Sequence, residues 1–186
     1  TTSLLGQLFA STTKVVKDYL SPDKPLPIVA AIPPDLDREL LTVFRNAMAD
    51  GGLSLSGWCP SPLALVFGSP GLLTQGDNTV AVVSIDWGIV TFAIVEIRDG
   101  FAQLRSFKNL DWSWRQWGQQ MPLDQVPDLI EETLSSAQEY WGIESDSINH
   151  LLIGGEEAWI PHLYPLVSER IPNAQFTPFN QPRLAA

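Results

Sequence analysis

Residues 80–101 read VAVVSIDWGIVTFAIVEIRDGF, and this stretch decides the fold that the sequence predicts. It holds two apolar runs rich in valine and isoleucine, separated by Asp86-Trp87-Gly88 and followed by Asp99-Gly100. β-Branched residues favour strands, and Asp-Gly is a typical hairpin turn. The stretch therefore predicts a β-meander, with a third strand from Phe101 to Phe107.

Asp86 would stand at the end of the first of these strands. A carboxylate there, followed by a glycine that lets the backbone turn closely, is how several folds place an acid near a metal-bound phosphate. Asp86, Gly88 and Thr91 are therefore a candidate phosphate or Mg²⁺ site. In the competing interpretation, Asp86 caps a tight turn and Thr91 is an ordinary strand residue. The branched residues Ile89 and Val90 favour this second interpretation, because they resist the backbone angles of phosphate loops.

The length, net charge and cysteine count of the chain limit the class of protein. The chain has 186 residues, a formal charge of −10 and one cysteine, so we expect one domain, or two small ones sharing an interface, without an internal disulfide. The charge argues against a nucleic-acid surface, which needs clustered Lys and Arg. No run approaches the ~20 apolar residues of a membrane span. We expect a cytoplasmic protein without membrane insertion and, since it opens at Thr1, a piece of a longer chain.

Helical and strand patterns alternate along the rest of the chain. Asp35 can cap a helix that Gly51-Gly52 ends, and Gly142 can end another. The segment 68–78 is turn-forming, and we expect it to be exposed. Expected helices cover residues 3–20, 36–50, 60–67, 124–141 and 160–171, and the further expected strands cover residues 28–32, 53–56, 150–153 and 174–179.

Several segments, in order, resemble the ATPase domain of the DnaK-type heat-shock chaperones. Residues 28–53 and 59–68 look like its strand, helix and Glu-Pro-Thr-Ala-Ala segment. Residues 84–93, SIDWGIVTFA, are similar to its second phosphate motif, Asp-Leu-Gly-Gly-Gly-Thr-Phe-Asp. Residues 150–161, HLLIGGEEAWIP, resemble its adenosine motif, Gly-Gly-Ser-x-Arg-Ile-Pro, and residues 180–186 resemble its closing segment.

The resemblance implies an α/β fold of the actin-like, ribonuclease H-like ATPase class. It would be a single lobe over residues 1–186, with a mixed central sheet and helices on both faces. The family's first phosphate-loop half and its inserted lid-like subdomain would be missing. ATP or ADP with Mg²⁺ would lie at residues carried over from the two motifs, which are Asp86, Gly88, Thr91, Gly154, Gly155 and Trp159.

Departures from the family motifs bear on chemistry. Ile89 and Val90 replace glycines that approach phosphate, Ala93 replaces a carboxylate, and Cys59 replaces an acid. Phosphoryl transfer depends on such positioning and charge. We therefore expect a degenerate nucleotide-binding module that acts as a binding or interaction scaffold, with weak or no ATP binding and no hydrolysis on its own. The alternatives are a fragment of a working chaperone-type ATPase and a purely structural interaction domain.

Other candidate residues have competing interpretations. Gly154-Gly155 could contact a phosphate or sugar, or could only supply a strand-to-helix turn, and the neighbouring Glu156 and Glu157 would repel phosphates. Cys59 has no histidine near it in sequence and is expected to be a packing residue. The two histidines, His150 and His162, are too isolated to predict a metal site.

Trp112, Trp114 and Trp117 form a cluster beside Arg115, in a segment without helical or strand periodicity. Exposed tryptophan with arginine is typical of protein interfaces, so the cluster predicts contact with a protein partner or a second copy of the chain. Alternatively, the rings cover the sheet face that a missing subdomain leaves open. The two interpretations are compatible in a homodimer.

Overall fold

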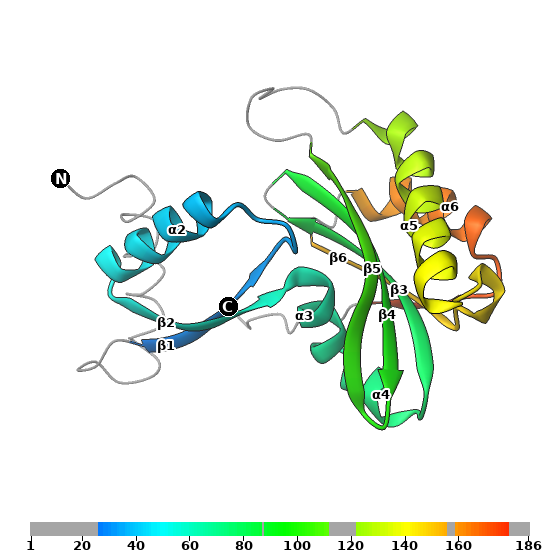
Figure 1. Ribbon diagram of the computed structural model, residues 1–186, viewed down its shortest axis with the longest axis horizontal. Coiled ribbons are helices and arrows are strands. Elements are labelled where there is room, and N and C mark those ends of the chain that lie inside the picture. The colour runs from blue at the N-terminus through cyan, green and yellow to red at the C-terminus, as the bar shows by residue number, and fades with distance from the viewer. Residues whose placement is uncertain (1–25, 87, 112–121, 156–158, 179–186) are drawn as a thin grey trace. The chain divides into compact units, whose positions relative to one another are not determined.

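The computed structural model describes residues 26–86, 88–111, 122–155 and 159–178 (Figure 1). The helix expected over residues 3–20 lies outside these ranges. The chain divides into two compact units, residues 1–59 and 60–186, and each is described here by itself. The expectation of a single lobe over the whole chain stays a prediction.

The first unit contains a strand, a helix and a second strand. These are β1 (Leu26–Ile32), α2 (Arg38–Asp50) and β2 (Leu53–Pro60), and the two strands form a two-stranded sheet. The glycines after α2 end it as expected, with the Gly51 N–H donating to the Ala47 carbonyl at 3.1 Å.

Asp37, and not Asp35, caps α2. The Asp37 carboxylate accepts a hydrogen bond from the Glu39 N–H at 2.8 Å. The helix begins later than expected because residues 33–36 form a turn, in which the Leu36 N–H donates to the Pro33 carbonyl at 3.2 Å. Because this turn includes Asp35 and Leu36, the second aspartate becomes the cap.

The second unit is built on a five-stranded sheet with the order β5-β4-β3-β6-β7. The predicted meander is confirmed, since β3 pairs antiparallel with β4, and β4 with β5. β6 pairs parallel with both β3 and β7, so the sheet is mixed and the unit belongs to the α/β class. The strands are β3 (Asn78–Asp86), β4 (Ile89–Arg98), β5 (Phe101–Asp111), β6 (His150–Gly155) and β7 (Gln175–Pro178).

The predicted Asp99-Gly100 reversal joins β4 and β5. Both residues have positive φ angles, 51° and 78°. A two-residue turn of this hand matches the twist of the strands that it connects, and asparagine, aspartate and glycine tolerate it best. The turn fixes the start of β5 at Phe101.

Helices cover both faces of this sheet, as Figure 1 shows for the second unit. Ala81, Val83 and Ile85 of β3 pack on the α5 and α6 side, whereas Val80 and Val82 pack on the α3 side. The helices are α3 (Ser61–Phe67), α4 (Pro70–Thr74), α5 (Val126–Trp141) and α6 (Ile160–Arg170), with short 3-10 turns at Leu123–Gln125 and Ser145–Ser147.

Helix α4 corrects the expectation that residues 68–78 form an exposed turn. Pro70 stands in the first turn of α4, where the missing N–H costs nothing. Leu72 is only 2% exposed, because it packs beneath the sheet with Val66 of α3. One buried leucine therefore orders a segment whose composition is otherwise that of a loop.

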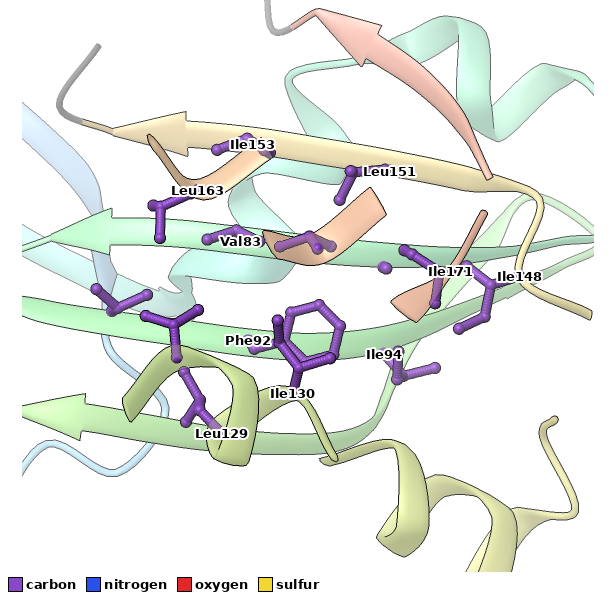
Figure 2. Close-up of a cluster of buried hydrophobic side chains, with 14 of the residues drawn as sticks. Val83, Phe92, Ile94, Leu129, Ile130, Ile148, Leu151, Ile153, Leu163 and Ile171 are labelled. Atoms are coloured by element: carbon purple, nitrogen blue, oxygen red, sulfur yellow. The ribbon is translucent and has the colours of Figure 1, made fainter. Parts of the chain in front are cut away.

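The larger core lies between the sheet and helices α5 and α6 (Figure 2). Phe92 and Ile94 of β4 meet Ile130 of α5, while Leu163 of α6 joins them from the other helix. All four side chains are at most 1% exposed. Burial of such a side chain contributes about 1.5–3 kcal/mol, so this face holds the sheet and both helices together.

A network of charged side chains anchors the end of α5. Arg105 is the extra residue of a β-bulge in β5, so its side chain points to the α5 face. Its Nε and Nη2 donate to one oxygen of Glu96 at 2.9 and 2.6 Å, and Arg98 binds the other oxygen. The same guanidinium lies 4.5 Å from the ring centroid of Trp141, which was expected on the apolar side of α5 but is 51% exposed.

Glu96 is ionised in this network. Burial alone would raise the pKa of its carboxyl, but the hydrogen bonds and charges of Arg105 and Arg98 outweigh burial and lower the pKa. Because the folded pKa is lowered, the carboxylate stabilises the fold at neutral pH. This contribution is lost as the pH falls through the lowered pKa, below the ordinary value of about 4.3.

We expect Arg105→Ala to lower the free energy of unfolding by about 1–3 kcal/mol, because it leaves the Glu96 carboxylate, which is 11% exposed, with one partner. The measurement is urea denaturation. The matched control is Arg98→Ala, whose side chain binds the same carboxylate but is 69% exposed, with an expected loss below about 1 kcal/mol. Equal losses for the two variants would contradict the anchoring role of Arg105.

Candidate functional site

The candidate phosphate turn lies at the end of β3. Asp86 is the last residue of β3 and pairs with Ile89, the first residue of β4. Gly88 has a φ of 74°, which explains the glycine there. Val90 is fully buried in the core and pairs with both Ile85 and Leu110. The backbone at Val90 is therefore already paired within the sheet, whereas the backbone of a phosphate-binding loop would be unpaired.

Thr91 uses its hydroxyl inside the sheet. The side chain is 1% exposed, and Oγ1 donates to Oδ1 of Asn109 on β5 at 2.7 Å. On the other side, Thr91 pairs with Ser84 of β3, and Ser84 pairs with Gly154 of β6. Thr91 therefore belongs to a row of three polar residues on β3, β4 and β5 that ends at Gly154 of β6.

Sequence reasoning did not single out Ser84 and Asn109, the other polar members of this row. The Ser84 hydroxyl is buried and has no hydrogen-bond partner among the described residues. It is the one polar residue in the apolar run from Val80 to Ile85, and that interruption was the available signal. Nothing in the local sequence marks Asn109, because its link to Thr91 depends on the strand register.

Gly154 and Gly155 lie inside β6 and not in a turn after it. A Cβ on Gly155 would collide with the backbone of Ile85, and its φ of 110° also disfavours a side chain. A Cβ on Gly154 would collide with the side chain of Leu65 on α3. Close packing against backbone thus accounts for Gly155, whereas the Leu65 side chain beside Gly154 could move; contact of either glycine with a phosphate or sugar stays a prediction.

Trp159 follows the end of β6 and precedes α6. It is half-buried at the start of α6, packs against the core on the α5 and α6 side, and has its ring centroid 5.9 Å from that of His162. Thr91 and Gly154 lie on the α3 side of the sheet. Of the six predicted nucleotide residues, the structure places Asp86, Gly88, Thr91, Gly154 and Gly155 near one end of the paired strands β3, β4 and β6, and Trp159 at the start of α6.

Cys59 is half-buried near the end of β2. Burial raises the pKa of its thiol, so the thiol is protonated at neutral pH and is a poor nucleophile. Within residues 26–86, 88–111, 122–155 and 159–178, no group of three His, Cys, Asp or Glu side chains could hold a metal ion. The predicted interaction residues Trp112, Trp114 and Trp117 lie outside the described residues.

A second set of aromatic side chains is exposed on the described part of the chain. Phe101, Tyr140 and Trp141 are 72%, 71% and 51% exposed, and we call them the aromatic surface. Phe101 pairs with Arg98 beside the β4–β5 turn, whereas Trp141 lies beside Arg105 at the end of α5, and both arginines bind Glu96. The place of Phe101 directly after the Asp99-Gly100 turn was the available sequence signal for an exposed ring.

No protein-family model matches this chain, and no curated protein matches it at a significant level. Among the described helices, none is long and apolar enough to cross a membrane. The geometry described above is therefore the basis for any statement about function.

We expect Gly155→Ala to lower the free energy of unfolding by about 2–4 kcal/mol, because the added Cβ meets the Ile85 backbone at a positive φ. Gly57→Ala in β2 is the matched control, since a Cβ there meets nothing within 4 Å, and its expected effect is below about 0.5 kcal/mol. Urea denaturation measures both. If Gly155→Ala were as stable as the control, the packing explanation would be wrong.

Proposed function

We propose that this chain is a degenerate relative of the DnaK-type nucleotide-binding domain, on an actin-like, ribonuclease H-like ATPase lobe. It acts as an interaction scaffold, binds ATP or ADP with Mg²⁺ weakly or not at all, and does not hydrolyse ATP on its own. The meander with a parallel fourth strand and helices on both faces supports the fold assignment. The motifs at residues 84–93 and 150–161 support the family assignment.

The pairing of β3 with β4 from Asp86 and Ile89 onward is the observation that supports a loss of catalysis. A phosphate-binding loop needs several consecutive backbone N–H groups that are free to approach the ligand. Here the antiparallel register already resumes at Ile89, next to Asp86, and continues through Val90 and Thr91. These backbone groups belong to the sheet, so a phosphate would have to open the hairpin to reach them.

Two side chains support the same conclusion. Thr91 holds its hydroxyl against Asn109, so ligand contact would break a buried hydrogen bond. Ala93 is fully buried at the position where the family carries a carboxylate. Phosphoryl transfer without this charge and without a free loop would lack most of its transition-state stabilisation.

The aromatic surface supports the scaffold role. Large exposed aromatic rings beside arginine are the composition of binding hot spots. Trp141 is held in one orientation by Arg105, so less side-chain entropy is lost when a partner covers it. The aromatic surface is suited to contact with a protein partner. A second copy of this chain is the partner to test first.

The nucleotide prediction is tested by thermal unfolding with and without millimolar Mg-ATP and Mg-ADP. We expect no resolved rise in Tm and no phosphate release above background. A ligand at a hundred times its Kd would add about 2.7 kcal/mol, which raises the Tm of a domain of this size by several degrees. Such a rise, lost in Asp86→Asn but kept in the control Asp50→Asn, would contradict the proposal and favour the alternative, a fragment of a working ATPase.

The scaffold prediction is tested by sedimentation analysis over a range of concentrations. We expect Phe101→Ser to weaken self-association by roughly tenfold or more, because it removes an exposed ring from the aromatic surface. The matched control is Phe67→Ser at the end of α3, a ring that is 50% exposed elsewhere on the same unit. A wild-type chain that stays monomeric at about 100 μM, or equal effects of the two variants, would contradict self-association through this surface.

A further inference from the structure

A pocket of about 340 Å³ lies at the end of the sheet opposite the candidate phosphate turn. One wall comes from the segment that joins α3 to α4 and from α4 itself, and the other comes from the first residues of β6 and β7. His150, which lines the pocket, begins β6, whereas Gly155 ends it, five residues or roughly 16 Å farther along the strand. The pocket is thus separate from the proposed nucleotide residues.

The parallel pairing of β6 with β7 builds the polar wall. His150 pairs with Gln175, and Leu152 pairs with Thr177. Leu152 packs in the core on the α3 side, so the alternation along both strands places His150, Gln175 and Thr177 on that side too. The Thr177 Oγ1 lies 3.4 Å from Nδ1 of His150, which brings a hydroxyl and an imidazole together in the pocket.

The opposite wall is held in place by buried contacts. Leu72 of α4 packs in the core, and the side-chain amide of Asn78 donates to the carbonyls of Leu72 and Gly76 at 3.4 and 3.1 Å. At the strand ends, the Gln175 N–H donates to the Asn149 carbonyl at 2.8 Å, and Oδ1 of Asn149 accepts from the Thr79 N–H at 3.0 Å. Both walls are therefore fixed without a ligand, as in most small-molecule sites.

The polar side chains of the pocket are uncharged. Ser69, Gln75, Gln175 and Thr177 each carry both hydrogen-bond donors and acceptors. Burial lowers the pKa of His150, so at neutral pH its imidazole is neutral; Nδ1 faces Thr177, and Nε2 is left to donate or to accept according to the tautomer. None of the described residues that line the pocket is charged, so a charged ligand would find no counter-charge there.

We propose that this pocket binds an uncharged, hydroxyl-rich small molecule of about monosaccharide size. A hydroxyl group donates and accepts at once, and it therefore matches the bifunctional side chains of both walls. The volume lies near the lower end of the roughly 300–1,000 Å³ typical of small-molecule sites, which favours one sugar or polyol ring over a larger ligand. The inference does not depend on the proposed loss of nucleotide chemistry, because it uses other residues.

The test is a titration of the ¹⁵N-labelled chain with D-glucose, D-galactose and myo-inositol, followed by NMR. We expect saturable shifts of the backbone amide signals of His150, Gln175 and Thr177 with at least one of them, with a Kd below about 10 mM. Glucose 6-phosphate and glucosamine serve as charged comparators, and they should bind at least roughly tenfold more weakly than their neutral parent. The signal of Gly155 should not move.

Two variants and one control test the wall itself. Thr177→Val keeps the shape of the side chain and removes its hydroxyl, and Gln175→Leu removes an amide, so each should weaken binding roughly three- to tenfold. Gln138→Leu on α5, away from the pocket, is the control and should bind as the wild type does. The proposal is overturned if no neutral compound shifts these amides at about 20 mM, if the charged comparators bind more tightly, or if folded variants bind unchanged.

Discussion

The pairing of β3 is the constraint on which the second unit depends. This strand has a hairpin partner, β4, on one edge and a crossover partner, β6, on the other, and helices cover both of its faces. Its residues from Val80 to Ile85 are therefore buried whichever way they point. A strand covered on both faces needs an almost continuous apolar run, and the sequence has one there. The positions of Thr91, Gly154 and Gly155 follow from the register of this strand with its neighbours.

Local patterns were sufficient to predict most elements of the fold. The meander followed from β-branched runs and an Asp-Gly turn, and α5 followed from helical spacing that Gly142 ends in the left-handed conformation. The errors occurred where a single contact outweighed composition. The burial of Leu72 orders α4 within a segment rich in glycine and proline, and a turn at Pro33 moves the cap of α2 from Asp35 to Asp37.

The candidate site was less predictable than the fold, for a physical reason. Thr91 and Gly155 were assigned to a candidate ligand site from their neighbours in sequence, and that assignment stays a prediction. Their actual contacts are with Asn109 and Ile85, across strands that only the folded register brings together. The same holds for Arg105 and Trp141, and for His150 and Thr177, since each pair joins segments far apart in the chain. Contacts between residues so far apart in the chain do not change the local hydrophobic periodicity of the sequence.

The bulge at Arg105 also affects how the sheet ends. In the described sheet β5 is an edge strand of eleven residues, long enough to act as a template on which further strands could add. The extra residue disturbs the even spacing of main-chain groups on that strand, and Lys108, bound to Glu132 of α5 at 3.3 Å, adds a charge beside it. A β-bulge and a charged side chain on an edge strand commonly prevent further strands from pairing with it. The exposed backbone of β5 is thereby a poorer template for another strand.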